Sequence, residues 1–546
     1  MEKKSVEWLP HLPEEVMEDA RGPEFDAYVV ALEGWRRGLT LKWHAKNSEK
    51  FSEMKTWHVD KPGKLFSLSS KGTTHYFFRT RGDKVTNEAV EIGSDKEKTK
   101  EYLQKAGINT PEGKRFKEDA SDEEILNYAE TIGYPVVIKP TDGSFGRGVV
   151  TDLGSKEELE KALYYVRHKS QYNDIIVERH VSGEDYRLYV VGDRTVGAIK
   201  RIPANITGDG THTINELIEI KNQKRKENPR LISCPILVNT ELKEYINKQG
   251  YSPDSILEEG KLLYLTNKNN ISIGGDPIAA FEELPEEVKR TAVKALHAMP
   301  GLMHGAVDIL FDRKSSMDSS IVILELNPTA QIGSLLFPLE GKASDIPSEI
   351  IDFYFPETKD VRSDKEKIYF DLTDVLYPLI TRTATSSTVT PAPLGAIYSK
   401  KYTVKGDVQG IDFHRGLRKQ AFERDLNGLV LNLYNGDIEV VVAGTDQEMV
   451  NDFRNALWED PERSEVTEVL ESEWNHPIKV GFEVKADLKT QLEQLKNLKQ
   501  GLEIAENQFK QVEKQNKKYK SSSSWKITWP IRFIGEVLKK IKVRSG

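Results

Sequence analysis

The sequence predicts a multidomain protein built from α/β and α+β domains. Its 546 residues are enough for roughly three or four domains, each with its own core. Helix-like and strand-like patterns alternate over most of the length, and from about residue 400 they run strand, helix, strand, turn, strand, helix. We therefore expect α/β domains first, then a ferredoxin-like domain with the split βαβ order, and then a C-terminal helix.

Composition narrows the class of protein. The net charge of −8 argues against general nucleic-acid binding, and 38% apolar with 30% charged residues is typical of globular chains. A single cysteine, Cys234, excludes a disulfide framework and a cysteine metal cluster. The N-terminus has no apolar core, and nowhere do 18 apolar residues follow one another. We expect a cytoplasmic protein, or one bound peripherally at the inner face of the membrane.

Residues 1–92 are expected to form a small α/β region. Asp26–Gly38 reads as an amphipathic helix, and strand-like runs with polar turns follow it. No catalytic constellation is evident there, so its expected role is to support a neighbouring site. The next helix is expected to start with Ser94 as its N-cap and to end at Gly107.

The stretch Gly133–Val149 predicts a phosphate-binding loop. A short apolar run ends in Lys139, and a loop with three glycines and Arg147 follows. Glycines let successive backbone N–H groups turn inward and form a cradle for phosphate oxygens. Taken alone the loop could be an ordinary turn, and its significance depends on what lies downstream.

Two later strands carry a set of hard oxygen ligands. Glu325 and Asn327 are two apart on one predicted strand and so point to the same face, while Asp308 lies in the partner strand. Oxygen donors converging inside a sheet are costly unless a cation is bound, and magnesium prefers such donors. The alternative is that Asp308 and Glu325 pair with nearby lysine or arginine.

Between the loop and this set, a strand turns outward at Gly183. Backbone groups of Glu178–Val181 could bind an adenine edge, with Asp185 placed for ribose hydroxyls and Arg187 on the same strand face. The alternative for each residue is a surface position on a hairpin.

Together these residues resemble the ATP-grasp superfamily over residues 93–357. The matching features are Asp-Lys before a helix, Ile-Lys-Pro with its glycine loop, V-E-x-x-x-x-G, and D…E-x-N in order. The chain looks most like the branch of cyanophycin synthetase and N-acetylglutaminylglutamine synthetase, through IKRIPANITGDGTHTINELI and NNISIGG.

The resemblance implies ATP as cofactor with Mg²⁺, usually two ions, for which Mn²⁺ could substitute. It implies that Lys96 and Lys139 bind the ATP phosphates, and that Arg187 and Arg201 face the transferring phosphate. Glu178–Val181 would hold the adenine and Asp185 the ribose. The implied nucleotide-binding residues are Lys96, Lys139, Gly143, Ser144, Phe145, Gly146, Arg147, Gly148, Glu178, Arg179, His180, Val181 and Asp185. The implied metal ligands are Asp308, Glu325 and Asn327.

ATP-grasp ligases phosphorylate a carboxylate and then let an amine attack the acyl phosphate. Such catalysis rests on positioning and charge neutralisation. The implied substrates are a small carboxylate and an amine, drawn from amino acids, peptides or surface-polymer precursors, and a homo-oligomer is possible. The identity of both substrates depends on loops such as residues 204–275, whose shape the sequence does not give.

Residues 399–486 are similar to acylphosphatase through GDVQGIDF, GLVLN and NGDIEVVVAG. In that family a loop and an arginine hold phosphate, and an asparagine orients the attacking water. Asn432 matches the asparagine, whereas His414 stands at the arginine position and Arg415 follows it. A neutral histidine stabilises a phosphate dianion less than arginine does. This domain either discharges or senses acyl phosphates, or is a disabled fold kept as a docking surface.

The C-terminal segment changes composition twice. Apolar residues recur at helical spacing from Leu488 to Val512, which fits a coiled coil or docking helix. From residue 521 a basic, aromatic stretch predicts contact with anionic lipid, with nucleic acid as the weaker alternative. Its SSSSWKITWPIR resembles tails of bacterial glycosyltransferases of surface-polysaccharide assembly. The expected divisions are 1–92, 93–357, a linker at 358–398, 399–486, a helix at 487–520 and a tail at 521–546.

The leading hypothesis is a bacterial ATP-dependent carboxylate–amine ligase fused to an acylphosphatase-like domain. A second class is an acylphosphatase with an ATP-binding regulatory domain, and a third is a nucleotide-binding scaffold. ADP release that needs both an acid and an amine would favour the ligase. Phosphate release from acyl phosphates without ATP would favour the hydrolase, and ATP binding without turnover the scaffold.

Overall fold

The computed structural model describes residues 5–485, except 23–24, 142–147, 171, 315–319, 410–412, 434 and 459–464, together with scattered positions between 492 and 513. Its contacts divide the chain into two compact units. The first comprises Met1–Tyr398, Gly444–Asp446 and Asn475–Gly481, and the second holds the remainder. None of the helices in the described part has the length and apolarity needed to cross a membrane. The predicted mixture of α/β and α+β domains is confirmed.

The N-terminal region packs a helix between a sheet and a second helix. Every residue of α2 (Phe25–Arg36) is buried, and the helix contacts β3 (Leu65–Ser70) and α12 (Ile346–Tyr354). The sheet has the order β19-β2-β3-β4-β5. Its other strands are β19 (Ser386–Thr388), β2 (Thr40–His44), β4 (Thr73–Phe78) and β5 (Arg81–Gly82). Residues 358–398, which were expected to form a linker, thus supply one strand of this sheet, β19. The same segment also contains β18 (Ile368–Tyr369) and α13 (Leu372–Ile380), which lie outside the sheet.

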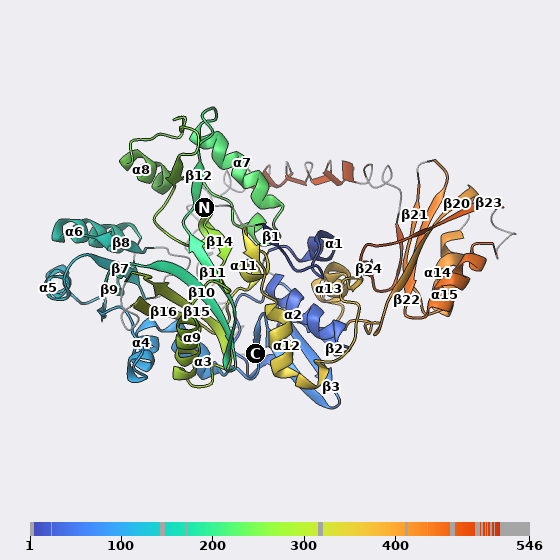
Figure 1. Cartoon of the computed structure of the whole chain (residues 1–546), viewed down its shortest axis with the longest axis horizontal. Coiled ribbons are helices and arrows are strands. Elements are labelled where there is room, and N and C mark those ends of the chain that lie inside the picture. Colours follow the sequence, from blue (N-terminus) through green and yellow to red (C-terminus); the bar gives the residue numbers. More distant parts are fainter. Residues whose placement is uncertain are drawn as a thin grey trace, which may run out of the picture. The chain divides into compact units, whose positions relative to one another are not determined.

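Two further sheets of the first unit position the site (Figure 1). The five-stranded sheet consists of β14 (Asp276–Ala279), β11 (Arg194–Ile202), β10 (Glu184–Val191), β15 (His304–Phe311) and β16 (Ile321–Asn327), in that order. The four-stranded sheet consists of β6 (Gly113–Phe116), β9 (Ile175–Arg179), β7 (Val136–Pro140) and β8 (Val150–Leu153). The helices that pack on these sheets include α3 (Asn87–Ser94), α4 (Lys96–Lys105), α9 (Glu286–Ala298) and α12 on the first, and α5 (Asp122–Ile132) and α6 (Lys156–Tyr164) on the second. Both sheets thereby gain buried apolar cores.

The start of α4 differs from the expectation. Ser94 was predicted as the N-cap, but it is the last residue of α3, and Asp95 caps α4 instead. The Asp95 carboxylate accepts hydrogen bonds from the backbone N–H groups of Glu97 (3.0 Å) and Lys98 (3.1 Å). An anion is favoured at a helix N-terminus, which explains why the carboxylate takes this place. As a result Lys96 becomes the first residue of the helix.

A small lobe, residues 204–265, has a hydrophobic core of its own. It contains β12 (Asn205–Thr207), α7 (Ile214–Lys226), α8 (Thr240–Lys248) and β13 (Leu262–Tyr264). A complete capping box of Thr213 and Glu216 starts α7. The small lobe is formed by the polar segment whose fold could not be predicted from the sequence.

The second unit has the predicted ferredoxin-like order of strands and helices. Its sheet runs β23-β20-β22-β21-β25, with two helices against it. The elements are β20 (Tyr398–Asp407), α14 (Phe413–Glu423), β21 (Asn427–Asn432), β22 (Ile438–Gly444), α15 (Gln447–Ala456), β23 (Glu465–Glu473) and β25 (Phe482–Lys485). The described positions between 492 and 513 are helical, with exposed leucines at 492, 495, 498 and 502. The predicted lipid-binding tail at 521–546 lies outside the described residues.

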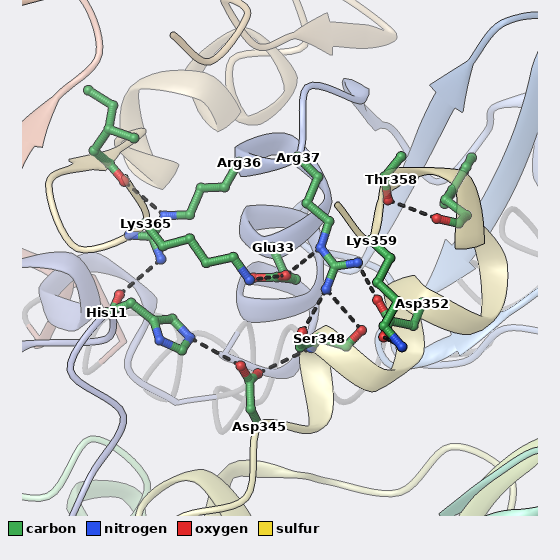
Figure 2. Close-up of polar contacts among 12 residues, drawn as sticks. His11, Glu33, Arg36, Arg37, Asp345, Ser348, Asp352, Thr358, Lys359 and Lys365 are labelled. Carbon is green, nitrogen blue, oxygen red and sulfur yellow. Dashed lines mark hydrogen bonds and ion pairs between the residues drawn. The ribbon is translucent and has the colours of Figure 1, made fainter. Parts of the chain in front are cut away.

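A polar network joins α2 to α12 in the first unit (Figure 2). Arg37 donates hydrogen bonds to Glu33 (2.6 Å), Asp352 (2.5 Å) and the Ser348 hydroxyl (2.6 Å). Lys365 also donates to Glu33, at 2.5 Å. Burial alone would raise the pKa of Glu33, but the charges of Lys365 and Arg37 outweigh it and hold that pKa below its ordinary value. The network therefore keeps a buried carboxylate ionised and ties the two helices together.

Asp345, the N-cap of α12, is the unfavourable member of this network. Burial, with a smaller contribution from the Glu33 charge, raises the pKa of Asp345 to about 6. Its neighbour His11 (3.7 Å away) offers no positive charge at neutral pH, because burial lowers the pKa of His11 to about 4. Asp345 therefore contributes to stability below its ordinary pKa of 3.8, and the contribution is lost as the pH rises through about 6.

We expect Asp345→Asn to raise the melting temperature at pH 8 and to change it little at pH 4. An asparagine keeps the side-chain oxygen that accepts from the Ser348 N–H (3.2 Å), so the cap survives while the buried charge is removed. Thermal unfolding followed by circular dichroism at both pH values checks this. An equal shift at both pH values would show that the charge is not the cause.

Candidate active site

A cavity of about 820 Å³ lies in the first unit, between residues of both site-forming sheets. It receives side chains from α4, β7, β9, β10, β11, β15 and β16, as well as from the N-terminal region and the small lobe. The sequence-predicted residues that line it are Lys96, Lys139, Glu178, Arg179, His180, Val181, Asp185, Arg187, Arg201, Asp308, Glu325 and Asn327. Twelve positions spread over more than 230 residues of sequence therefore meet in one place.

Of the predicted phosphate loop, Gly143–Gly148, the structure describes only Gly148. Gly143, Ser144, Phe145, Gly146 and Arg147 lie outside the described residues. Gly148 is described and has a positive φ of 71°, and a Cβ atom there would lie 2.7 Å from the Pro140 side chain. Only glycine fits this position without strain.

Lys139 is held in the cavity wall by Glu178. The Lys139 Nζ lies 2.5 Å from Glu178 Oε2, and Lys100 donates to the other carboxylate oxygen at 3.0 Å. Burial would raise the pKa of Glu178, but these two lysines outweigh it and the pKa falls below its ordinary value. Lys96 approaches from α4 and donates to the Thr141 carbonyl oxygen at 3.1 Å. Two ammonium groups thus lie at the entrance to the expected phosphate loop.

Antiparallel register brings two arginines onto Asp308. Arg187 of β10 faces Asp308 of β15, and its guanidinium binds both carboxylate oxygens at 2.8 and 2.9 Å. Arg201 bridges Asp185 (2.7 Å) and Asp308 (3.0 Å). Burial would raise the pKa of Asp308, but the charges of Arg187 and Arg201 outweigh it and hold that pKa below its ordinary value. Asp308 therefore makes the arginine pairing that the sequence left open as an alternative, and both guanidiniums are fixed in the cavity wall.

Glu325 stands opposite Asp308 but has no such partner. The register shifts between Asp308 and Ile309, so Leu324 is an extra residue in β16 and Glu325 still faces the cavity. Within the described part of the chain, the Glu325 carboxylate has no hydrogen bond or ion pair, whereas Asp308 is paired with Arg187 and Arg201. Burial and the charge of Asp308 raise the pKa of Glu325, with Lys96, Arg187 and Lys139 acting against them. A carboxylate in this situation favours a bound cation.

The residues beside Glu325 also lack partners. Asn327 Nδ2 and Thr329 Oγ1 are buried, and neither finds a hydrogen-bond partner among the described residues. The unpaired Glu325 carboxylate, beside the arginine-paired Asp308 and the Asn327 amide oxygen, offers oxygen ligands of the kind that a Mg²⁺ ion carrying phosphate oxygens prefers. The described residues contain no group of three or more His, Cys, Asp or Glu side chains placed for a metal, so the site depends on this mixed set.

Sequence reasoning missed two arginines in the cavity. Arg79 comes from the N-terminal region, where no functional residue was expected, and Arg230 comes from the small lobe. No local pattern distinguishes either residue. Their importance becomes visible only when distant segments are brought together.

Comparison with known proteins agrees with this geometry. Residues 95–202 match the family model described as the carbamoyl-phosphate synthase L chain, ATP binding domain, and residues 400–484 match the acylphosphatase model. Over 273 residues, 49% of this chain, the sequence is 34% identical to cyanophycin synthetase from Crocosphaera subtropica, covering 31% of that protein. This chain therefore carries a region similar to ATP-grasp domains and, after it, a region similar to acylphosphatase.

Two other matches concern the ATP-grasp domain. A glutathione biosynthesis bifunctional protein from Pasteurella multocida is 30% identical over 274 residues, covering 49% of this chain and 36% of that protein. The crystal structure of a bifunctional glutathione synthetase from Pasteurella multocida is 28% identical and covers 54% of this chain and 41% of that one, with a TM-score of 0.42. The chain thus spans about a third of the length of the curated relatives it matches.

The acylphosphatase domain carries its two predicted residues on neighbouring elements. His414 lies in the first turn of α14, and Asn432 ends β21. The Asn432 Oδ1 atom is buried, and no described residue bonds to it. The Gln409 amide donates to the carbonyl oxygens of Leu433 (2.7 Å) and Asp437 (2.6 Å), which ties the end of the first strand to the turn after β21.

Proposed function

We propose that the chain is an ATP- and magnesium-dependent ligase that joins a carboxylate to an amine. The observation that carries this proposal is the meeting of Lys139, the Arg187–Asp308 pair and the unpartnered Glu325 in a single cavity. The phosphates of a nucleoside triphosphate need positive groups on several sides, and the metal that binds these phosphates needs oxygen ligands from the protein. The similarity to cyanophycin synthetase and to glutathione biosynthesis proteins supports the same reaction class.

In this proposal each group has a separate task. Lys96 and Lys139 bind ATP phosphates. Asp308, Glu325 and Asn327 hold Mg²⁺, which neutralises phosphate charge when bound. Backbone groups of Glu178–Val181 bind the adenine.

Three side chains complete the nucleotide and phosphoryl contacts. Arg187 and Arg201, fixed by aspartates, stabilise the charge on the transferring phosphoryl group. Asp185 contacts the ribose. Its Oδ1 atom is taken by Arg201 and its Oδ2 atom accepts one bond from Asn269 (3.1 Å), which leaves acceptor capacity on Oδ2 for a hydroxyl.

The reaction itself needs no protein nucleophile. A carboxylate oxygen attacks the γ-phosphorus of ATP, the bond to the bridging oxygen breaks, and ADP leaves. The amine nitrogen then attacks the acyl carbon, inorganic phosphate departs, and the amine loses a proton to give the amide. The side chains act by holding both substrates in line and by neutralising charge.

The test is ADP release from the full chain with Mg-ATP and a panel of amino acids, peptides and uronic acids, with products identified by mass spectrometry. The proposal requires release that depends on both an acid and an amine and that yields an amide. ATP binding without turnover over the whole panel would support a nucleotide-binding scaffold instead.

A second activity is favoured by the acylphosphatase match and the unpartnered Asn432. We expect hydrolysis of acyl phosphates to be slow, because His414 stands where the family has arginine. His414→Arg is then expected to raise turnover of benzoyl phosphate by the full chain at least about tenfold, since arginine is always charged and binds phosphate with two donors. Inorganic phosphate release without ATP is the readout. If the wild type hydrolyses benzoyl phosphate rapidly and His414→Arg slows this hydrolysis, then histidine itself acts at this site.

A further inference from the structure

The cavity contains a second cationic cluster, formed by Arg79 and Arg230, that the phosphate and metal sites do not use. Both side chains are half-buried. Both are connected to the loop that leaves β16 directly after the metal-site residue Asn327. Both therefore line the same cavity as the expected metal ligands.

Arg79 is held by the N-terminal region. Its backbone has a φ of 58°, which is unusual for a residue with a side chain. One Nη atom donates to Asp26 at 2.6 Å, and the other Asp26 oxygen accepts from the Ile332 N–H at 3.0 Å. The adjacent Thr80 hydroxyl donates to the Ala330 carbonyl oxygen at 2.9 Å. Among the described residues the Arg79 guanidinium makes one hydrogen bond, to Asp26, and its Nε is buried without a partner.

Arg230 is a cation without a counter-ion. Its guanidinium donates to Cys234 Sγ (2.7 Å), to the Ser233 hydroxyl (3.2 Å) and to Gln331 Oε1 (2.9 Å), all neutral groups. No carboxylate pairs with it in the part of the chain that the structure describes. A Cβ atom on Gly333 would lie 2.6 Å from the Arg230 side chain, so its stem packs tightly against this loop. The charge is therefore fixed in place and uncompensated.

The anchors of the two arginines are consecutive residues of one loop. Arg79 reaches Ile332 through Asp26, and Arg230 binds Gln331 directly. Arg230 is a half-buried guanidinium without an anion, which is costly, and Arg79 keeps unused donors beside its ion pair with Asp26. Two planar forks beside a cavity match a carboxylate. The unpartnered Thr329 hydroxyl on the same loop provides another donor.

We propose that Arg79 and Arg230 form a subsite for a free substrate carboxylate, distinct from the carboxylate that is phosphorylated. This inference rests on the proposed function and adds a substrate class: at least one of the joined molecules carries an extra carboxylate. That group comes either from a diacid donor or from an amino acid or peptide that supplies the amine. The cluster recognises the same anion in both cases.

The first experiment needs no turnover. Calorimetry with glutarate as probe, in the presence of Mg-ADP, compares the full-length wild type with Arg79→Gln, Arg230→Gln and the matched surface control Arg290→Gln. Arg290 is 68% exposed, pairs with Glu287 and lies outside the cavity. We expect at least about a tenfold weaker affinity in the two cavity variants and no change in the control. Equal affinity in all four proteins, or no binding by wild type, would overturn the inference.

Arg79→Lys serves as the second variant, because Arg79→Gln also removes the tie to Asp26 and could unfold the region. Lysine keeps that ion pair but loses the fork, so weaker glutarate binding at an unchanged melting temperature supports the subsite. Unchanged binding by Arg79→Lys at the same melting temperature would remove Arg79 from it.

The second experiment identifies the molecule that carries the carboxylate. KM values from ADP release are compared for amino acids and peptides and for the same compounds as carboxamides. If Arg230→Gln raises the KM at least about tenfold for the free acids of one substrate, the donor or the amine, and not for the matching carboxamides, the subsite binds that substrate. An equal rise for acids and amides would contradict the inference. If no compound releases ADP, the ligase proposal fails while the glutarate result stands by itself.

Discussion

Replacing Glu325 with glutamine is expected to lower ADP release at least about 100-fold, which is the scale on which loss of one charge-stabilising group slows catalysis. Glutamine has the same shape but cannot supply the negative charge that Mg²⁺ requires. The protein should be as stable as before or more stable, because burial and Asp308 already disfavour the ionised carboxylate. ADP release measured with a coupled assay, together with the melting temperature, separates the two effects.

Glu184→Gln is the matched control for that experiment. Glu184 lies on the same five-stranded sheet, but it faces Lys200 and Tyr186 and does not line the cavity. Its substitution should leave ADP release within about twofold of wild type. An equal loss of activity in both variants would mean that Glu325 acts through the sheet and not through a metal.

Lys139→Gln is expected to raise the Kd for Mg-ATP at least about tenfold. A hydrogen bond to a charged group contributes about 1.5–3 kcal/mol, and each 1.4 kcal/mol corresponds to a factor of ten. Glu178 would keep Lys100 as a partner, so the fold should tolerate the change. Calorimetric titration of Mg-ATP into the variant gives the measurement.

Lys100→Gln provides an internal comparison, because both lysines bind the same carboxylate. Lys139 lines the cavity and Lys100 does not. We therefore expect nearly wild-type nucleotide affinity in Lys100→Gln. Similar weakening in the two variants would show that the Glu178 ion pairs support the strand and that Lys139 does not contact nucleotide.

The shared face of Glu325 and Asn327 could be predicted from the sequence because strand periodicity is local, while their role as metal ligands stays a prediction. Alternation in β16 places Glu325 and Asn327 on one face whatever the rest of the chain does. The bulge at Leu324 precedes both residues and so does not disturb their relation. The ferredoxin-like order of the second unit was accessible for the same reason, since each element there is short and has its own pattern.

Features that depend on contacts between distant parts of the chain could not be predicted from the sequence. Arg79 reaches the cavity only because Thr80 and Asp26 bind a loop that lies 250 and 306 residues further along the chain, respectively. Arg230 depends on Gln331 in the same way. The exchange of Ser94 for Asp95 as a helix cap was a smaller error, arising because two capping residues stand side by side.

The account centres on a metal-bound nucleotide between Lys139 and the three oxygen ligands of β15 and β16. A crystal structure with Mn²⁺ and a non-hydrolysable ATP analogue tests it most directly, because manganese is located by anomalous scattering. We predict manganese peaks in contact with oxygens of Asp308, Glu325 and Asn327, with the phosphates within reach of Lys139. Nucleotide bound elsewhere, or manganese without contact to any of these three residues, would contradict the account.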